Sequence, residues 1–231
     1  MTIAETKPLG TKVLVRGAAG VLSLFVLVFV SAGTLDYWQG WLYILLNLGV
    51  IVATLFALRN NPQLIQERLN PKKGMKDWDK LYFALSTPLY LGGVVLAGVD
   101  VGRFEWSPPL PLWVYALSIA AFIVGQAIFL WAKKTNAFFS SVVRIQTERG
   151  QTVCREGPYR YVRHPGYVGS LIWALAAPLI LGSVWALIPA LLSDVLLIWR
   201  TAKEDETLQR ELPGYTGYAR DVKYRLVPRV W

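Results

Sequence analysis

Residues 167–199 read YVGSLIWALAAPLILGSVWALIPALLSDVLLIW and contain no Lys or Arg. The stretch is too long for one membrane helix, which needs about 20 apolar residues to cross roughly 30 Å of hydrocarbon. It is interrupted near its middle by Pro178, Gly182, Ser183 and Pro189. Backbone polar groups cannot remain unpaired in lipid, so we expect a helical hairpin that turns near Gly182-Ser183.

Four further apolar runs precede this stretch: Val13–Ala32, Trp41–Leu58, Leu81–Val99 and Leu112–Ala132. Hydrophobic residues make up 54% of the chain and charged residues only 17%, whereas a soluble domain is nearer a quarter charged. The first run follows basic residues as a signal peptide does, but we expect an uncleaved span because more membrane segments follow. The sequence therefore predicts an all-α, polytopic membrane bundle of about six transmembrane helices.

The basic residues alternate with the apolar runs. All of them except Arg103 fall in the N-terminal segment, in Arg59–Lys80, in Lys133–Arg163 or in the tail that begins at Arg200. Lys and Arg concentrate in cytoplasmic loops, so six spans with both termini in the cytoplasm account for this pattern. The net charge of +9 then reflects membrane topology, and we expect membrane lipids rather than nucleic acid as partners.

This topology divides the chain into two parts. Residues 1–132 hold four spans, and residues 133–231 form a region with the hairpin 167–199 and a cytoplasmic tail. The polar pieces 133–166 and 200–231 flank the hairpin, so both are expected on the cytoplasmic side.

The first candidate site is the segment 157–169, GPYRYVRHPGYVG, at the start of the hairpin. Pro165 suits the first turn of a helix, and Gly166 permits close approach of another group to the backbone. A helix N-terminus favours an anionic or polar ligand group. The Arg and Tyr residues here serve equally well as interface anchors, whereas His164, the sole histidine, favours a functional role.

The second candidate site is the segment Arg200–Leu208. Arg200 and Glu204 are four residues apart and share a helix face. An Arg can hold a carboxylate through two hydrogen bonds, and a Glu can bind an ammonium group, but a solvated charged helix explains the pattern equally well. Cys154 is the only cysteine and His164 the only histidine, so we expect no metal site built from several such ligands.

Together the two segments resemble a known family. The stretch from about Asn136 to Pro228 is similar to the isoprenylcysteine carboxyl methyltransferase and phospholipid methyltransferase superfamily. The matching elements are Gly157-Pro158-Tyr159, Arg163-His164-Pro165-Gly166-Tyr167-Val168-Gly169, Arg200, Glu204-Asp205, Leu208, Tyr215, Tyr218 and Arg225-Leu226-Val227-Pro228. Gln151 stands where family members often have a second His, and Asp205 replaces a frequent Glu, which we take as a mild change.

The resemblance implies that both polar pieces hold S-adenosylmethionine. Residues implied to line its site are Tyr159, His164, Pro165, Gly166, Tyr167 and the strand-like Gln151, Thr152, Val153 and Cys154. Glu204 is implied to bind the cofactor's amino group, and Arg200 to orient the acceptor. The stretch 136–140 either lines the site or is a structural loop.

The resemblance implies a membrane methyltransferase that acts on a lipophilic or lipid-linked acceptor. Methyl transfer is an in-line displacement, so alignment and exclusion of water supply much of the rate. A carboxylate acceptor needs no base, whereas an amine acceptor would use His164 or Glu204. The catalytic candidates are therefore Arg200, His164 and Glu204. Two alternatives stay open: an NAD(P)H-dependent membrane reductase of the sterol-reductase type, with a similar Arg-His-Pro-x-Tyr-x-Gly turn, and a non-catalytic membrane protein.

Overall fold

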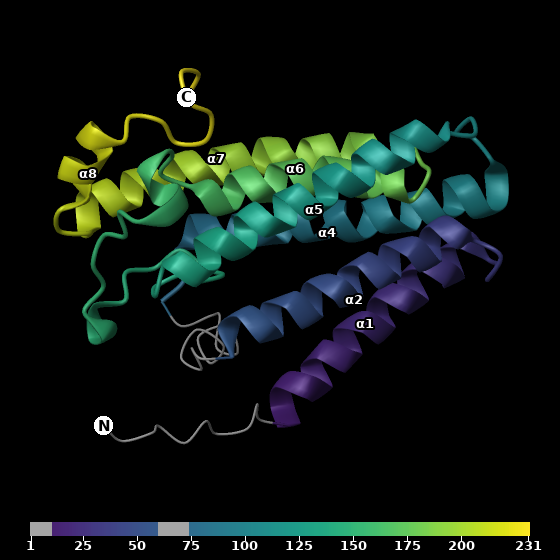
Figure 1. Cartoon of the computed structure of the whole chain (residues 1–231), viewed down its shortest axis with the longest axis horizontal. Helices are drawn as coiled ribbons and strands as arrows, with labels where there is room; N and C mark the ends of the chain where they lie inside the picture. Colours follow the sequence, from purple (N-terminus) through teal and green to yellow (C-terminus); the bar gives the residue numbers. More distant parts are fainter. Residues whose placement is uncertain (1–10, 60–73) are drawn as a thin grey trace.

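The computed structural model describes residues 11–59 and 74–231, which form a bundle of long helices (Figure 1). The long helices are α1 (Thr11–Ala32), α2 (Trp38–Leu58), α4 (Asp77–Val99), α5 (Leu112–Thr135), α6 (Pro165–Ile180) and α7 (Leu187–Glu211). Shorter elements are the π-helix η1 (Asp100–Phe104), the 3-10 helices η2 (Thr147–Arg149) and η3 (Gly157–Arg160), and the helix α8 (Tyr215–Asp221). Helices α4 to α7 lie together, and the pair α1–α2 diverges from them towards one end (Figure 1).

The apolar runs coincide with these helices, and the predicted hairpin is confirmed. Its arms are α6 and α7, and the chain reverses between Leu181 and Ala186. Gly182 adopts a φ of +83° in this turn, a conformation that suits glycine. The turn is tied to η1, which directly follows α4, because Ser183 Oγ donates a hydrogen bond of 2.5 Å to the buried carboxylate of Asp100.

The protein is an integral membrane protein by the length and polarity of its helices. Three helical segments are long and apolar enough to span a bilayer, namely Trp38–Leu58, Asp77–Phe104 and Leu112–Thr135. Gly17–Ala32 and Pro165–Ile180 are shorter apolar helices, and α7 becomes strongly charged after Trp199. Six spans therefore remain an expectation. Of the basic residues that indicate this topology, Lys7, Arg68, Lys72 and Lys73 fall at 1–10 and 60–73, outside the described residues.

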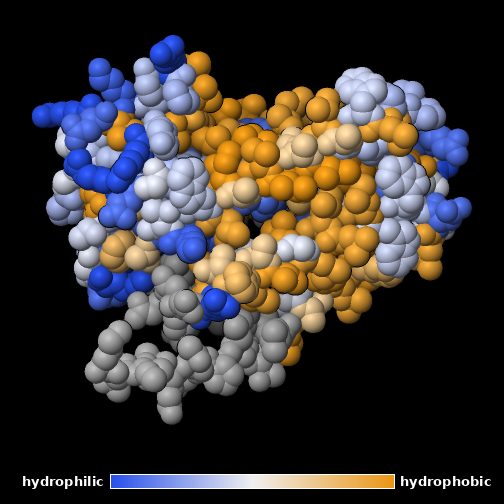
Figure 2. Space-filling view, viewed as in Figure 1, coloured by the Kyte–Doolittle hydropathy of each residue, from blue (hydrophilic) through white to orange (hydrophobic). Residues whose placement is uncertain are grey.

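The surface has the polarity that a bilayer requires. A wide apolar band covers the middle of the bundle, and polar residues gather at its two ends (Figure 2). Large apolar side chains in this band are highly exposed, among them Leu45 at 63% and Val52 at 66%. In water such a continuous patch would favour aggregation, whereas in a membrane it contacts lipid.

Close packing of α5 against α6 sets where the hairpin begins. A Cβ on Gly169 would lie 2.4 Å from the carbonyl oxygen of Gly125, and one on Gly125 would lie 2.7 Å from that of Gly169. The two glycines therefore let the backbones touch, as small residues do between membrane helices. This contact holds the second turn of α6 beside the middle of α5.

One local prediction is wrong. Gln151–Cys154 was expected to be strand-like, but the structure contains no strand within 11–59 and 74–231. The segment has no neighbouring strand to pair with. The N–H of Gln151 instead donates to the carbonyl of Gln146 at 3.2 Å, closing the turn around η2.

Candidate active site

A cavity that is partly open to solvent lies at the end of the bundle that carries α8. Its walls come from the connection between α5 and α6, from the first turn of α6, from the charged part of α7 and from α8. The polar pieces on either side of the hairpin thus enclose one space.

The cavity gathers most of the residues singled out in the sequence. The lining residues among them are Gln151, Thr152, Val153, Cys154, Tyr159, His164, Gly166, Tyr167 and Glu204. Phe138, Phe139 and Ser140 also line it, which favours a site role for the stretch 136–140 over a purely structural loop.

Two of the candidate residues do not line the cavity. Pro165 is buried as the first residue of α6. Arg200 lies behind the wall, 6% exposed, where its guanidinium carbon is 5.3 Å from the centre of the Tyr167 ring. Arg200 is bound there by Asp79, to which its Nε donates at 2.7 Å.

Glu204 presents a carboxylate to the cavity from α7. The phenol of Tyr167 donates a short hydrogen bond to its Oε2, and the imidazole of His164 stacks on the same phenol, with an angle of 4° between the rings. Glu204 is partly exposed, whereas His164 is buried. The arrangement holds one anionic group beside two flat aromatic faces, which suits a ligand that joins an ammonium group to an aromatic base.

Asp205 is a buried carboxylate that binds several side chains at this wall. It is 0% exposed and accepts hydrogen bonds from Arg163 Nε at 2.7 Å, Arg225 Nε at 2.9 Å and Tyr215 Oη at 3.0 Å. Burial opposes its ionisation, but hydrogen bonds from His164 and Arg163 outweigh this and lower the pKa of Asp205 below its ordinary value. Loss of this carboxylate would therefore leave two arginines, Arg163 and Arg225, without their counter-charge.

The histidine is oriented by the same carboxylate. His164 Nε2 lies 3.2 Å from Asp205 Oδ1. Since an ionised carboxylate only accepts hydrogen bonds, Nε2 carries the proton and Nδ1 carries the lone pair in the neutral ring. The ring is therefore fixed in orientation by α7 while it forms part of the cavity wall.

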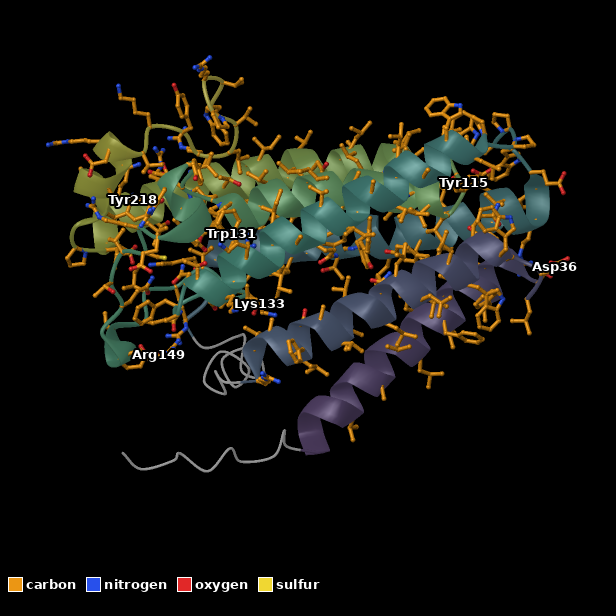
Figure 3. The ribbon with its side chains drawn as sticks, in the orientation of Figure 1. Asp36, Tyr115, Trp131, Lys133, Arg149 and Tyr218 are labelled. Atoms are coloured by element: carbon orange, nitrogen blue, oxygen red, sulfur yellow. The ribbon has the colours of Figure 1, made fainter. Side chains whose placement is uncertain are left out.

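The C-terminal segment closes the site from outside. The N–H groups of Arg163 and His164 donate to the carbonyls of Tyr224 at 2.9 Å and Arg225 at 3.0 Å. On α8, the phenol of Tyr218 donates to the carbonyl of Tyr159 at 2.7 Å. Burial is the main cause that raises the pKa values of Tyr159 and Tyr218, so both phenols are neutral donors at physiological pH. Tyr218 and Lys133 lie towards this polar end, opposite Tyr115 (Figure 3).

Sequence reasoning missed several residues of the wall. Val142, Val143 and Arg144 line the cavity from the connection after α5, and Leu208 and Leu212 from the end of α7. Leu208 and Tyr215 were part of the quoted pattern without an assigned role. No spacing rule pointed to the apolar Val residues, because only the path of the connection brings them to the cavity.

The fold and the site together define a class of protein. It is an integral membrane protein whose helices carry, at one end, a cavity for a small molecule that is lined by a carboxylate, an oriented imidazole and several phenols.

Comparison with known proteins shows which family the chain resembles. The profile of the Isoprenylcysteine carboxyl methyltransferase (ICMT) family matches residues 116–210, which confirms the resemblance predicted from the sequence. The matched region runs from α5 to the end of α7 and includes most of the cavity wall.

Individual relatives agree with this match. Protein-S-isoprenylcysteine O-methyltransferase of Schizosaccharomyces pombe is 37% identical over 72 residues, 30% of this chain and 30% of that protein. A probable protein-S-isoprenylcysteine O-methyltransferase of Oryza sativa is 32% identical over 107 residues, 43% of this chain and 54% of that protein.

A relative of another kind is Delta(14)-sterol reductase TM7SF2 of Mus musculus. It is 26% identical, with 83% of this chain and 52% of that protein covered. The chain thus spans between 30% and 54% of the length of these three relatives.

Proposed function

We propose that this protein is an S-adenosylmethionine-dependent methyltransferase of the membrane that methylates a lipophilic or lipid-linked acceptor. The observation that carries the proposal is that His164 and Glu204, from two segments about forty residues apart, line one cavity in the region that matches a methyltransferase family. The names of the yeast and rice relatives support the same chemistry.

The residues present fit this cofactor. The Glu204 carboxylate suits an ammonium group, because hydrogen bonds between charged partners are the stronger kind. The rings of Tyr159, His164 and Tyr167 offer flat faces to an adenine, and the segment 151–154 offers backbone groups. When bound, S-adenosylmethionine would supply a methyl group activated on a sulfonium. The protein's task is then to orient that group and to exclude water.

A groove beside this cavity offers a place for the acceptor. An apolar groove runs between α1, α2 and α5, and its lining is almost entirely Leu, Val, Ile, Ala, Gly and Phe. Phe129 lies in that groove and Phe139 in the cavity wall, and their rings meet edge to face at 5.3 Å. A lipid chain in the groove would therefore end close to the cofactor site, which supports a lipophilic acceptor.

The guanidinium of Arg200 has one nitrogen, Nη1, left to meet an anionic acceptor. Its Nε and Nη2 are occupied by Asp79 and by the carbonyl of Ser141. Among the residues that the structure describes, none forms a hydrogen bond with Nη1. We propose that a carboxylate acceptor binds to Nη1 of Arg200. We also propose that the cavity end of the bundle faces the cytoplasm.

A sterol-type reductase is the second candidate, because the mouse reductase matches a larger share of this chain than the methyltransferases do. Calorimetry in detergent separates the two. We expect the protein to bind S-adenosylhomocysteine and not NADPH. Binding of NADPH alone would replace the proposal with the reductase, and binding of neither would favour a protein without catalytic function.

A single variant links this binding to the site. Glu204→Gln removes the charge while keeping the shape of the side chain. A hydrogen bond to a charged group contributes about 1.5–3 kcal/mol, so we expect S-adenosylhomocysteine affinity to fall roughly 10- to 100-fold. Glu206→Gln is the matched control, since Glu206 is half exposed and pairs only at 3.5 Å with Lys203 and Arg210. Equal affinities of the two variants would remove Glu204 from the cofactor site.

A further inference from the structure

Asp79 is a fully buried carboxylate near the start of α4. It lies outside residues 116–210, the part that matches the methyltransferase family. Its Oδ1 accepts a hydrogen bond of 2.7 Å from Arg200 Nε, and its Oδ2 accepts one of 3.3 Å from Arg200 Nη2. An isolated charge in such a place would be very costly, so Asp79 and Arg200 depend on each other.

The pair is held inside an aromatic enclosure. The guanidinium carbon of Arg200 lies 4.7 Å from the ring centre of Tyr82, 5.1 Å from that of Phe83 and 5.3 Å from that of Tyr167. Tyr82 and Phe83 belong to α4, as Asp79 does, whereas Tyr167 belongs to α6. The arginine of α7 is therefore clamped between two other helices.

The Asp79–Arg200 pair contacts two parts of the cavity wall. Asp79 Oδ2 also accepts the N–H of Val143 at 2.7 Å, and Arg200 Nη2 donates to the carbonyl of Ser141 at 2.9 Å. Val143 lines the cavity, and so does Tyr167, whose phenol binds Glu204. One ion pair thus supports both the connection after α5 and the phenol of Tyr167. That phenol orients Glu204, the residue proposed to bind the cofactor.

Further contacts join α4 to α7 on either side of this pair. The rings of Trp78 and Trp199 meet edge to face at 6.1 Å, and Lys76 binds Glu211 at 2.7 Å. The start of α4 therefore runs along the charged part of α7 and keeps it beside the cavity.

We propose that Asp79 is a positioning residue of the active site, which acts through Arg200 to place the cavity walls formed by Ser141–Val143 and by Tyr167. The inference rests on the proposed function, because it takes this cavity as the cofactor site. It extends the site to a helix that the family match does not include.

A double-mutant cycle tests this coupling. The variants are Asp79→Asn, Arg200→Gln and the double variant, and the readouts in detergent are the S-adenosylhomocysteine affinity and the melting temperature. Asp77→Asn is the matched control, because Asp77 lies one residue before Trp78 on the same turn, is 95% exposed and pairs with Lys80. A purely structural role would lower the melting temperature and leave the affinity of the folded fraction unchanged.

We expect Asp79→Asn to weaken binding about 10-fold in the wild-type background and less than about 2-fold when Arg200 is already replaced, since residues in one network are not additive. Asp77→Asn should bind as the wild type does. Losses that add in the double variant, or an affinity of Asp79→Asn equal to that of Asp77→Asn, would overturn the inference.

The proposed function has its own control in the same experiment. If the wild type binds NADPH and not S-adenosylhomocysteine, the methyltransferase proposal fails, and the cycle is run with NADPH to test the positioning role. If the wild type binds neither, the cavity is not a cofactor site and the inference fails with it.

Discussion

Replacing Asp205 by Asn should be among the most damaging single changes in the polar end of the protein. The carboxylate is 0% exposed and faces Arg163, whose side chain is 6% exposed, and Arg225, whose side chain is 31% exposed. Asn keeps one oxygen for these donors but turns an NH₂ group towards the others. The variant therefore leaves a buried guanidinium without a counter-charge.

The size of the effect follows from the burial of Arg163. Removal of one partner from a buried ion pair costs about 3–5 kcal/mol, and the more exposed Arg225 adds little because water screens it. For a chain of this size about 1 kcal/mol corresponds to roughly 2–4 °C in melting temperature. We expect Asp205→Asn to lower the melting temperature by about 10 °C.

The assay is thermal unfolding in detergent, followed by tryptophan fluorescence without added ligand. Glu206→Gln is the control, because Glu206 is the next residue on α7 but its side chain is 50% exposed. Its melting temperature should stay within about 2 °C of the wild type, since surface changes are usually within ±0.5 kcal/mol. A decrease no larger for Asp205→Asn than for Glu206→Gln would refute the argument from burial.

The pH dependence of the melting temperature provides a second test of the role of Asp205. Its pKa is lowered in the folded state from an ordinary value of 3.8. A lowered pKa means that the stabilisation is fully present above the unfolded-state value and is lost as the pH falls through the folded-state value. The difference in melting temperature between wild type and Asp205→Asn should therefore be constant from about pH 5 to pH 8 and shrink below about pH 4. A difference that shrinks near neutral pH would contradict this assignment.

Three further predictions concern packing, the site and topology. Gly169→Ala places a Cβ 2.4 Å from the carbonyl oxygen of Gly125 and should destabilise the protein by about 1–3 kcal/mol or more; Gly92→Ala, with nothing within 4 Å, is the control in the same thermal assay. Tyr167→Phe removes the hydrogen bond to Glu204 and should weaken S-adenosylhomocysteine binding about 3- to 10-fold by calorimetry; unchanged affinity would show that this bond does not hold Glu204 for the ligand. A reporter fused to the C-terminus should be active only in the cytoplasm, and activity on the opposite side would exclude the six-span topology.

Much of the architecture was determined by the sequence alone. Continuous apolar runs predict membrane helices because lipid leaves the backbone no partner outside the helix, and the run 112–132 indeed lies within α5. Gly182 marked the hairpin turn because few other residues adopt its positive φ. The ordered pattern from Gly157 to Glu204 likewise pointed to the family, since residue types and their spacing can be read directly from the sequence.

Only the tertiary structure revealed what holds the site together. Asp79 is separated from Arg200 in the chain by the two long helices α5 and α6, and its neighbours Asp77 and Lys80 suggest an ordinary solvated helix start. Asp205 looks like one more acid in the run Lys203–Glu206 until Arg163 and Arg225 are brought against it. Which carboxylate becomes a buried partner of an arginine depends on the rotation and crossing of helices, because the energy of an ion pair depends on distance and burial, and neither can be read from residue order.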